Sequence, residues 1–272
     1  LDKMGKWIDA VVIATPDHTH FVATYHSMAN GKHVLTEKPL VHNVWQARTL
    51  RKAANYYNVV TQMGNQGHAT EGIRYVKEWY QAGAIGEVDE VMAYNPGPRF
   101  GPDRSFQRPS TLPASSQAVP AHLNWDLWKG PTAPNIKYNE CYLPKSWRGF
   151  WQFGNGQLGD WACHTLDAPF WALEPGMPSS VKVRDIKEPW LGIVPQQSAV
   201  EWTFPREGKN PLKLTWYEGH KPSDNPTNGE KEWGDDFNMA MIGTKGVIGH
   251  NARPNSPRLY PEAYWEDFKR NL

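Results

Sequence analysis

Apolar residues near the start of the chain follow two successive patterns, first a continuous run and then a helical spacing. Residues 10–14 form an unbroken apolar run, typical of a strand covered on both faces in a parallel sheet. From residue 20 to residue 30 apolar side chains recur with a helical period, and Gly31 is suited to end that helix. A second strand is predicted at residues 33–36. The order strand, helix, strand predicts a right-handed crossover that brings both following turns to the carboxyl edge of the sheet, where doubly wound sheets bind ligands.

The hydrophobic pattern continues along the rest of the chain. The predicted elements are a helix at residues 44–57, a strand at 59–63, a sharp turn at 64–67, a helix at 71–82, a strand at 87–94, a helix at 156–173, strands at 180–186, 198–204 and 212–217, and a hairpin around 239–248. We place a domain boundary at the sharp turn, between residues 66 and 67. The later strands indicate a second sheet that is large, open and mostly antiparallel, and the fold class is α/β.

The helix predicted at residues 156–173 carries polar side chains on an otherwise apolar element. Asp160, His164 and Asp167 are separated by four and three residues, and these spacings place all three on one side of a helix. A surface face held by salt bridges explains this pattern as well as a catalytic face does.

Composition limits the classes of partner. The 272 residues include 29 basic and 28 acidic side chains, for a net charge of +1, and no dense Lys/Arg run, so we expect no nucleic-acid partner. No apolar stretch approaches the roughly 20 residues that a spanning helix needs, so we expect no membrane partner. Fourteen Trp residues are compatible with stacking on sugar rings, although burial as a core or rim anchor is the better explanation for any one of them.

Two motifs resemble signatures of the Gfo/Idh/MocA family. The first is Ala14-Thr15-Pro16 with His18 and His20, followed by Glu37-Lys38-Pro39. The second runs from Gly159 to Asp167 and matches the pattern DxxxHxxD, and residues 125–131 are similar to a run in a bacterial subgroup of the family. The family comprises nicotinamide-dependent sugar and cyclitol oxidoreductases with a dinucleotide-binding domain followed by an α/β substrate domain.

The resemblance implies a domain organisation. Residues 1–66 are expected to be the carboxyl-terminal half of a Rossmann-like dinucleotide-binding domain, and residues 67–272 an α/β domain for substrate binding and oligomerisation. No GxGxxG occurs in the sequence, so we expect the pyrophosphate-binding turn to lie upstream of Leu1, in an amino-terminally incomplete chain. We expect a homo-oligomer formed through the open sheet, by analogy with the fold. Localisation stays open between the cytoplasm and, given an upstream signal, the periplasm or the exterior.

The chemistry of alcohol oxidation indicates catalytic residues. Removing a hydroxyl proton while hydride leaves carbon requires a base near neutral pKa, next to a donor that stabilises the developing alkoxide. His164 is suited to be the base, Asp160 to orient the imidazole or bind a neighbouring hydroxyl, and Lys38 to donate to the reacting oxygen. The resemblance implies the same three roles. Lys38 and His164 are far apart in sequence, so this site requires the two predicted domains to face each other.

Further residues are expected around the site. Those expected to contact NAD or NADP are Ala14, Thr15, Pro16, His18, His20, Glu37, Lys38, Asn65 and Gln66, and those expected to bind substrate are Trp147, Arg148, Asp160 and Trp161. Helix capping by the two histidines and an exposed salt bridge of Arg148 are alternatives of equal weight. Cys163 and His164 are adjacent and point to different helix faces, so no metal site is predicted.

The sequence predicts an NAD(P)-dependent dehydrogenase acting on a CH–OH group of a sugar, cyclitol or glycoside. One alternative is a redox-neutral glycosidase or lyase of the same fold, which oxidises a sugar transiently and returns the hydride. The other is a non-catalytic carbohydrate-binding protein that uses an aromatic cleft.

Overall fold

The computed structural model describes residues 3, 5–97, 111–113, 115–144, 146–188 and 191–270. The chain forms two compact units that are interleaved along the sequence. The first unit comprises Leu1–Asn65, Arg99–Asp160 and Trp190–Val194, and the second comprises Gln66–Pro98, Trp161–Pro189 and Pro195–Leu272. The assignment of a cofactor domain to residues 1–66 and a substrate domain to residues 67–272 stays a prediction.

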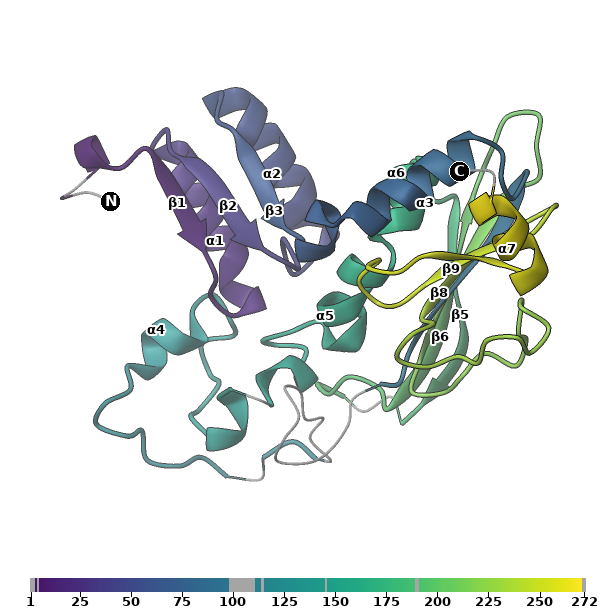
Figure 1. Ribbon diagram of the computed structural model, residues 1–272. Coiled ribbons are helices and arrows are strands. Elements are labelled where there is room, and N and C mark those ends of the chain that lie inside the picture. The colour runs from purple at the N-terminus through teal and green to yellow at the C-terminus, as the bar shows by residue number, and fades with distance from the viewer. Residues whose placement is uncertain are drawn as a thin grey trace. The chain divides into compact units, whose positions relative to one another are not determined.

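A three-stranded parallel sheet organises the first unit (Figure 1). Its strands are β1 (Ala10–Ile13), β2 (His33–Glu37) and β3 (Thr61–Gly64), in that order, and its helices are α1 (Asp17–Ala29) and α2 (Val44–Tyr57). Both crossovers run in the same direction with the same hand, so both helices cover the same face of the sheet. On that face Ile13, Val34 and Leu50 are buried. Val12 points to the other face and is 71% exposed, so β1 is not covered on both faces as the apolar run predicted.

A second core of the first unit is an aromatic cluster. It surrounds α4 (Trp125–Lys129) and the short 3₁₀ turns Glu140–Tyr142 and Trp147–Gly149, and a further 3₁₀ turn, Gly5–Trp7, precedes β1. The buried members of the cluster are Trp125, Tyr138, Trp147, Phe150, Phe153 and Ile193. Because this segment has little regular structure, burial of large aromatic rings is its main source of stability. Part of the high Trp content is therefore explained by packing.

A seven-stranded mixed sheet organises the second unit. Its order is β10-β9-β8-β4-β7-β6-β5, and only β4 and β7 are parallel neighbours. The strands are β4 (Val88–Asn95), β5 (Ser180–Lys187), β6 (Gln197–Phe204), β7 (Leu212–Glu218), β8 (Met239–Gly243), β9 (Val247–His250) and β10 (Arg258–Tyr260). The helices α3 (Glu71–Gln81), α6 (Asp167–Leu173) and α7 (Glu262–Arg270) contribute to one core with the sheet. The predicted fold class, a Rossmann-like sheet followed by a large and mostly antiparallel one, is confirmed.

The predicted helix at residues 156–173 is two helices in the structure. α5 (Gly156–Thr165) ends before Leu166, and α6 starts at Asp167. The cause is Pro169, which has no N–H to donate and whose ring would clash with the carbonyl of Thr165 in a continuous helix. Asp167 therefore does not lie on the helix that carries Asp160 and His164, which corrects the prediction of a single three-residue face.

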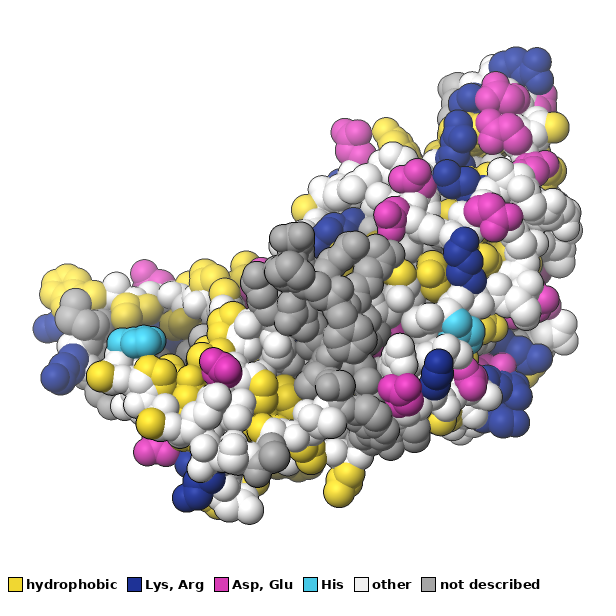
Figure 2. Space-filling model, turned by 90° about the horizontal axis from the view of Figure 1, so that it is seen from below, with side chains coloured by type: hydrophobic (Ala, Val, Ile, Leu, Met, Phe, Trp, Pro, Cys, Tyr) yellow, Lys and Arg dark blue, Asp and Glu magenta, His cyan; other side chains and the backbone are white. Residues whose placement is uncertain are grey.

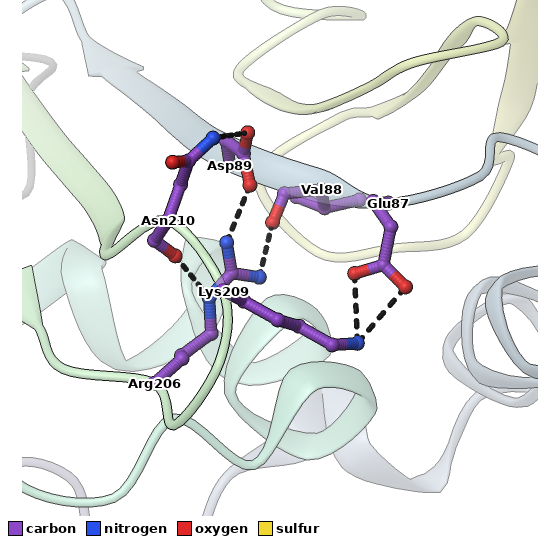
Figure 3. A network of polar contacts seen from close by, with 6 residues as sticks. All are labelled: Glu87, Val88, Asp89, Arg206, Lys209 and Asn210. Carbon is purple, nitrogen blue, oxygen red and sulfur yellow. Dashed lines mark hydrogen bonds and ion pairs between the residues drawn. The ribbon is translucent and has the colours of Figure 1, made fainter.

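A network of charges fixes the turn between β6 and β7 to the start of β4 (Figure 3). Arg206 donates to the carbonyl oxygen of Val88 at 2.6 Å and forms an ion pair with Asp89. Lys209 pairs with Glu87 at 2.9 Å. Hydrogen bonds from Asn210 and Arg206 lower the pKa of Asp89. These contacts order the end of the sheet where β4 begins.

Acidic and basic side chains are interspersed on the face of the molecule shown in Figure 2. Apolar side chains are also frequent on this face, mainly at the left of the view. Within the described ranges, no helix has the length and apolar character needed to cross a bilayer.

Candidate active site

A buried histidine ties together two turns at the carboxyl edge of the three-stranded sheet. His20, 1% exposed, places Nδ1 2.7 Å from the carbonyl oxygen of Pro39 and Nε2 2.6 Å from that of Thr15. His18 places Nε2 2.9 Å from the carbonyl oxygen of Trp128, and burial lowers the pKa of His18. Both rings face backbone carbonyls outside α1, so neither histidine caps the helix. Their predicted contact with a cofactor stays a prediction.

Lys38 follows β2 and forms an ion pair with Asp160. Its Nζ donates to Oδ1 of Asp160 at 2.7 Å and to the main-chain oxygen of Asp160 at 2.6 Å. Nε of Arg148 lies 3.2 Å from the same Oδ1. The three side chains are 13%, 11% and 25% exposed in the order Lys38, Asp160, Arg148, so water screens their charges only weakly. One carboxylate is therefore held between two cations, and the catalytic roles that the sequence analysis gave to Lys38 and Asp160 stay predictions.

The start of α5 is anchored beside this ion pair. His42 places Nε2 3.1 Å from the carbonyl oxygen of Gly154, and Asn155 donates to the carbonyl oxygen of Val41 at 3.4 Å. A Cβ added to Gly154 would lie 2.7 Å from Cα of Arg148, so only glycine permits this approach. These contacts join the segment after Lys38 to the residues that lead into Asp160.

Asp17 is a fourth charged member of the site that the sequence did not indicate. It occupies the first position of α1, is 2% exposed, and its Oδ2 has no hydrogen-bond partner among the residues that the structure describes. Burial raises the pKa of Asp17 to about 7. The negative charge of Asp160 raises this pKa further, whereas the positive charges of Arg148 and Lys38 lower it. The available sequence signal was an acid next to the turn that follows β1.

Replacing Asp17 with asparagine should change the pH dependence of stability. The pKa of Asp17 is about 7 in the folded state, above the ordinary value of 3.8. Between these two pH values the folded state binds more protons than the unfolded state, so rising pH lowers the free energy of unfolding. From about pH 5.5 to about pH 8, the native chain should lose about 2 kcal/mol of unfolding free energy relative to Asp17→Asn. Urea unfolding at both pH values measures this difference.

Asp126→Asn is the matched control, because it also removes one carboxylate from the first unit but at an 85% exposed side chain. Equal pH dependence of unfolding in the native chain and Asp17→Asn would show that Asp17 does not titrate as its burial implies.

The second unit supplies a cluster of aromatic and charged side chains around the end of α5. His164 is 1% exposed, and its ring contacts the Trp161 ring edge-to-face at 5.8 Å. The guanidinium of Arg253 lies over the Trp161 ring at 5.2 Å from its centroid. Asp167 accepts from Nδ1 of His68 at 3.0 Å, and burial raises the pKa of Asp167 while this bond lowers it. His164 follows Asp160 by four residues, or about one turn, along α5.

The remaining predicted residues lie as follows. Trp147 is buried, with the Arg148 guanidinium 4.2 Å from its ring centroid, and the carboxyl of Glu37 packs against Gly64, where an added Cβ would lie 2.8 Å away. The Thr15 hydroxyl accepts from Thr19 at 2.7 Å. Ala14 and Pro16 flank Thr15 at the end of β1, Asn65 follows β3, and Gln66 begins the 3₁₀ turn Gln66–Ala69. The roles assigned to these residues stay predictions.

No group of three His, Cys, Asp or Glu side chains suited to a metal ion occurs in the described part of the chain. Burial raises the pKa of the Cys141 thiol to about 11, which disfavours the thiolate form that a metal binds.

Two family models match the chain. Residues 1–65 match a model described as an oxidoreductase family with an NAD-binding Rossmann fold, and residues 100–207 match the C-terminal alpha/beta domain of the same family. The curated relatives include 2,7-anhydro-N-acetylneuraminate hydratase of Escherichia coli, 29% identical over 84 residues, which are 31% of this chain and 23% of the relative. Levoglucosan dehydrogenase of Pseudarthrobacter phenanthrenivorans is 30% identical over 81 residues, which are 30% of this chain and 21% of the relative.

Solved structures share the fold across most of the chain. The WlbA dehydrogenase of Bordetella pertussis, in complex with NADH and UDP-GlcNAcA, has a TM-score of 0.60 at 16% identity and covers 94% of this chain and 64% of its own. An inositol dehydrogenase homolog of Azotobacter vinelandii, complexed with NADH and myo-inositol, has a TM-score of 0.54 at 18% identity. The match covers 93% of this chain and 53% of that homolog. The chain thus spans less than two thirds of the length of these proteins. With both family models in order along the sequence, the chain belongs to the Gfo/Idh/MocA family of NAD-binding oxidoreductases.

Proposed function

We propose that this protein transfers a hydride between a CH–OH group of a sugar, cyclitol or glycoside and a nicotinamide cofactor. The observation that carries the proposal is the Asp160 carboxylate held by Lys38 and Arg148, on the helix that also carries His164. A cation, a fixed carboxylate and an imidazole are the groups that alcohol oxidation requires. The curated relatives whose names describe sugar chemistry support the choice of substrate class.

The residues at the carboxyl edge of β1, β2 and β3 fit a nicotinamide cofactor. The edge presents Thr15, Glu37 and Lys38, and the buried Oδ2 of Asp17 lacks a hydrogen-bond donor in the described part of the chain, as expected where a ligand completes the site. Thr15 after the end of β1, the first residues of α1, Glu37 and Asn65 would border the bound cofactor. A bound nicotinamide supplies the carbon that accepts the hydride.

Lys38 and His164 would divide the work on the substrate hydroxyl. Lys38 has three N–H donors and uses two of them on Asp160 in the described structure, so the third is available to the reacting oxygen. His164 would take the hydroxyl proton, and Lys38 would stabilise the negative charge that develops on that oxygen. Asp160, fixed by Arg148, would keep Lys38 in position.

A second candidate is a redox-neutral reaction on a sugar, in which the hydride is returned to the substrate. It is favoured by two curated relatives named 2,7-anhydro-N-acetylneuraminate hydratase, from Escherichia coli and from Mediterraneibacter gnavus. The same Lys38 and His164 would serve both reactions, because each begins with oxidation of a CH–OH group.

The test is an assay of the protein expressed from its complete reading frame with NAD⁺ and with NADP⁺. A panel of sugars, cyclitols and glycosides is scored by absorbance of the reduced nicotinamide and, in parallel, by NMR of the products. Net cofactor reduction supports the dehydrogenase, and a new sugar product without net reduction supports the second candidate. Saturable sugar binding without either product would overturn both in favour of a carbohydrate-binding protein.

We also propose that the protein forms a homo-oligomer through the seven-stranded sheet. β5 is exposed along its length, and its Arg184 pairs with Glu201 of β6 at 2.6 Å on the surface. A monomer in light scattering over the micromolar range would contradict this proposal.

A further inference from the structure

Arg253 projects from a loop that is firmly held within the second unit. The loop joins β9 to β10, and the N–H of Ala252 donates to Oδ1 of Asn238 at 2.9 Å. The carbonyl oxygen of Pro254 accepts from the Thr70 hydroxyl at 3.3 Å, and a Cβ added to Gly72 would lie 1.7 Å from that oxygen. Such close backbone packing leaves the loop no room to shift towards α3. The Arg253 side chain therefore starts from a fixed backbone.

The guanidinium of Arg253 lies beside the helix that carries the proposed base. Its carbon is 5.2 Å from the Trp161 ring centroid, and the edge-to-face partner of that ring is His164. All three side chains belong to the second unit. A cation is thus placed one aromatic ring away from His164.

Arg253 has no anionic partner among the described residues. Nε is inaccessible to water and has no hydrogen-bond acceptor, although the residue as a whole is only half-buried. By contrast, Arg184 and Arg206 each pair with a carboxylate through hydrogen bonds. Leaving a guanidinium N–H buried without an acceptor costs stability that a cation–π contact recovers only in part. A ligand that brings an acceptor would remove this cost.

The chemistry of the guanidinium indicates the kind of ligand. Its planar fork of N–H donors matches the two oxygens of a carboxylate, and the match is stronger where water is partly excluded. Phosphate groups are usually bound by several cations or by a glycine-rich helix start, whereas Arg253 projects from a loop between two strands. A sugar acid presents a carboxylate on the same small molecule as the hydroxyl that would be oxidised.

We propose that Arg253 binds the carboxylate of the substrate and that the substrates are sugar acids, such as uronic, aldonic or sialic acids. The inference rests on the proposed function, because it places the carboxylate next to a hydroxyl that His164 deprotonates. It makes Arg253 a specificity-determining residue. Neutral sugars would reach the same site and bind more weakly, because a hydroxyl oxygen accepts a weaker hydrogen bond from a guanidinium than a carboxylate does.

The experiment compares matched pairs of ligands that differ only in the carboxylate. Methyl glucuronide with methyl glucoside and galacturonate with galactose are titrated into the protein expressed from its complete reading frame, with saturating NAD⁺. Binding is followed by the Nε–H NMR signal of Arg253, assigned by its loss in Arg253→Lys, and turnover is followed by cofactor reduction. Arg253→Gln should raise the Kd of the acids roughly 30-fold or more and leave the Kd of the neutral sugars within about twofold. Arg253→Lys should fall between the two.

Arg258→Gln is the matched control, since its guanidinium pairs with Glu262 at 3.7 Å on the surface of the same unit. Equal affinity of the native protein for acid and neutral partners, or unchanged acid binding in Arg253→Gln, would overturn the proposal. Turnover of neutral sugars that is indifferent to Arg253→Gln would leave the proposed function standing and reject sugar acids. Binding of sugar acids that depends on Arg253, without any turnover, would support the carboxylate site and reject the proposed hydride transfer.

Discussion

Replacing Lys38 with methionine should lower kcat by roughly 10³-fold, with little loss of stability. Lys38 donates to both the side chain and the main chain of Asp160, and its remaining N–H is the proposed donor to the reacting oxygen. Methionine keeps the length and apolar body of the side chain but removes every donor and the charge. Asp160 retains its ion pair with Arg148 at 3.2 Å, so the carboxylate is not left unpaired. Steady-state kinetics on a substrate found by the assay above, with thermal unfolding alongside, measures both effects.

Lys32→Met is the matched control for this experiment. Lys32 also belongs to the first unit and also donates to a main-chain oxygen, that of Gly5, at 2.6 Å. It lies directly before β2, whereas Lys38 follows the end of that strand, so its loss should leave kcat within about twofold. If Lys38→Met retained native kcat, the proposed role of the cation in stabilising the alkoxide would be rejected.

Short-range patterns were sufficient to predict the three strands and the helices α1 and α2 of the first unit, but not its short helix α4. α2 runs from Val44 to Tyr57, where the apolar spacing predicted it, and Asn43 caps it by accepting from the N–H of Gln46 at 3.0 Å. α1 begins at Asp17 rather than at His20, because Pro16 has the extended backbone of an N-cap and the helix starts directly after it. The three added residues have few apolar side chains, so the helical period did not include them. This displacement placed Asp17 outside the predicted helix.

Two elements of the second unit were missed for different reasons. β10 has only three residues, Arg258–Tyr260, which is too short for an alternating pattern to be recognised. α7 has no fully buried residue, and its apolar side chains Tyr264, Trp265 and Phe268 pack only partly against the core. Their i, i+1 and i+4 spacing was a signal that could have been used.

The candidate site divides into residues that motifs identify and residues that only tertiary structure identifies. The two motifs identify Lys38 and Asp160 as site residues, whereas the ion pair between them is seen only in the structure. Asp17 and Arg253 are identified by a buried polar atom that has no hydrogen-bond partner among the described residues, and their neighbours in sequence do not reveal this property. A Pro at residue 169 was visible in the sequence and should have divided the long helix, since proline at that position excludes a continuous helix through Thr165.

Replacing His164 with asparagine should lower kcat roughly 10³-fold and remove the fall in rate on the acidic side of the pH profile. A base must be unprotonated to accept the hydroxyl proton, so the native rate should decline as pH falls through the pKa of the group that acts. Asparagine preserves polarity and approximate size but cannot accept that proton at any pH in this range. Measuring kcat from about pH 5.5 to about pH 9 in the native protein and the variant separates the two behaviours.

The pH profile is the decisive measurement because His164 is 1% exposed and contacts Trp161, so its replacement also disturbs packing. A packing defect would lower kcat by a similar factor at every pH, whereas loss of the base should lower it most where the native enzyme is fastest. His220→Asn is the matched control, because His220 is a 28% exposed histidine of the same unit that lies 3.8 Å from Asp185. If His164→Asn retained the native rate and pH profile, another group would have to accept the proton, and Asp17, a buried carboxyl with a pKa of about 7, would be the first to test.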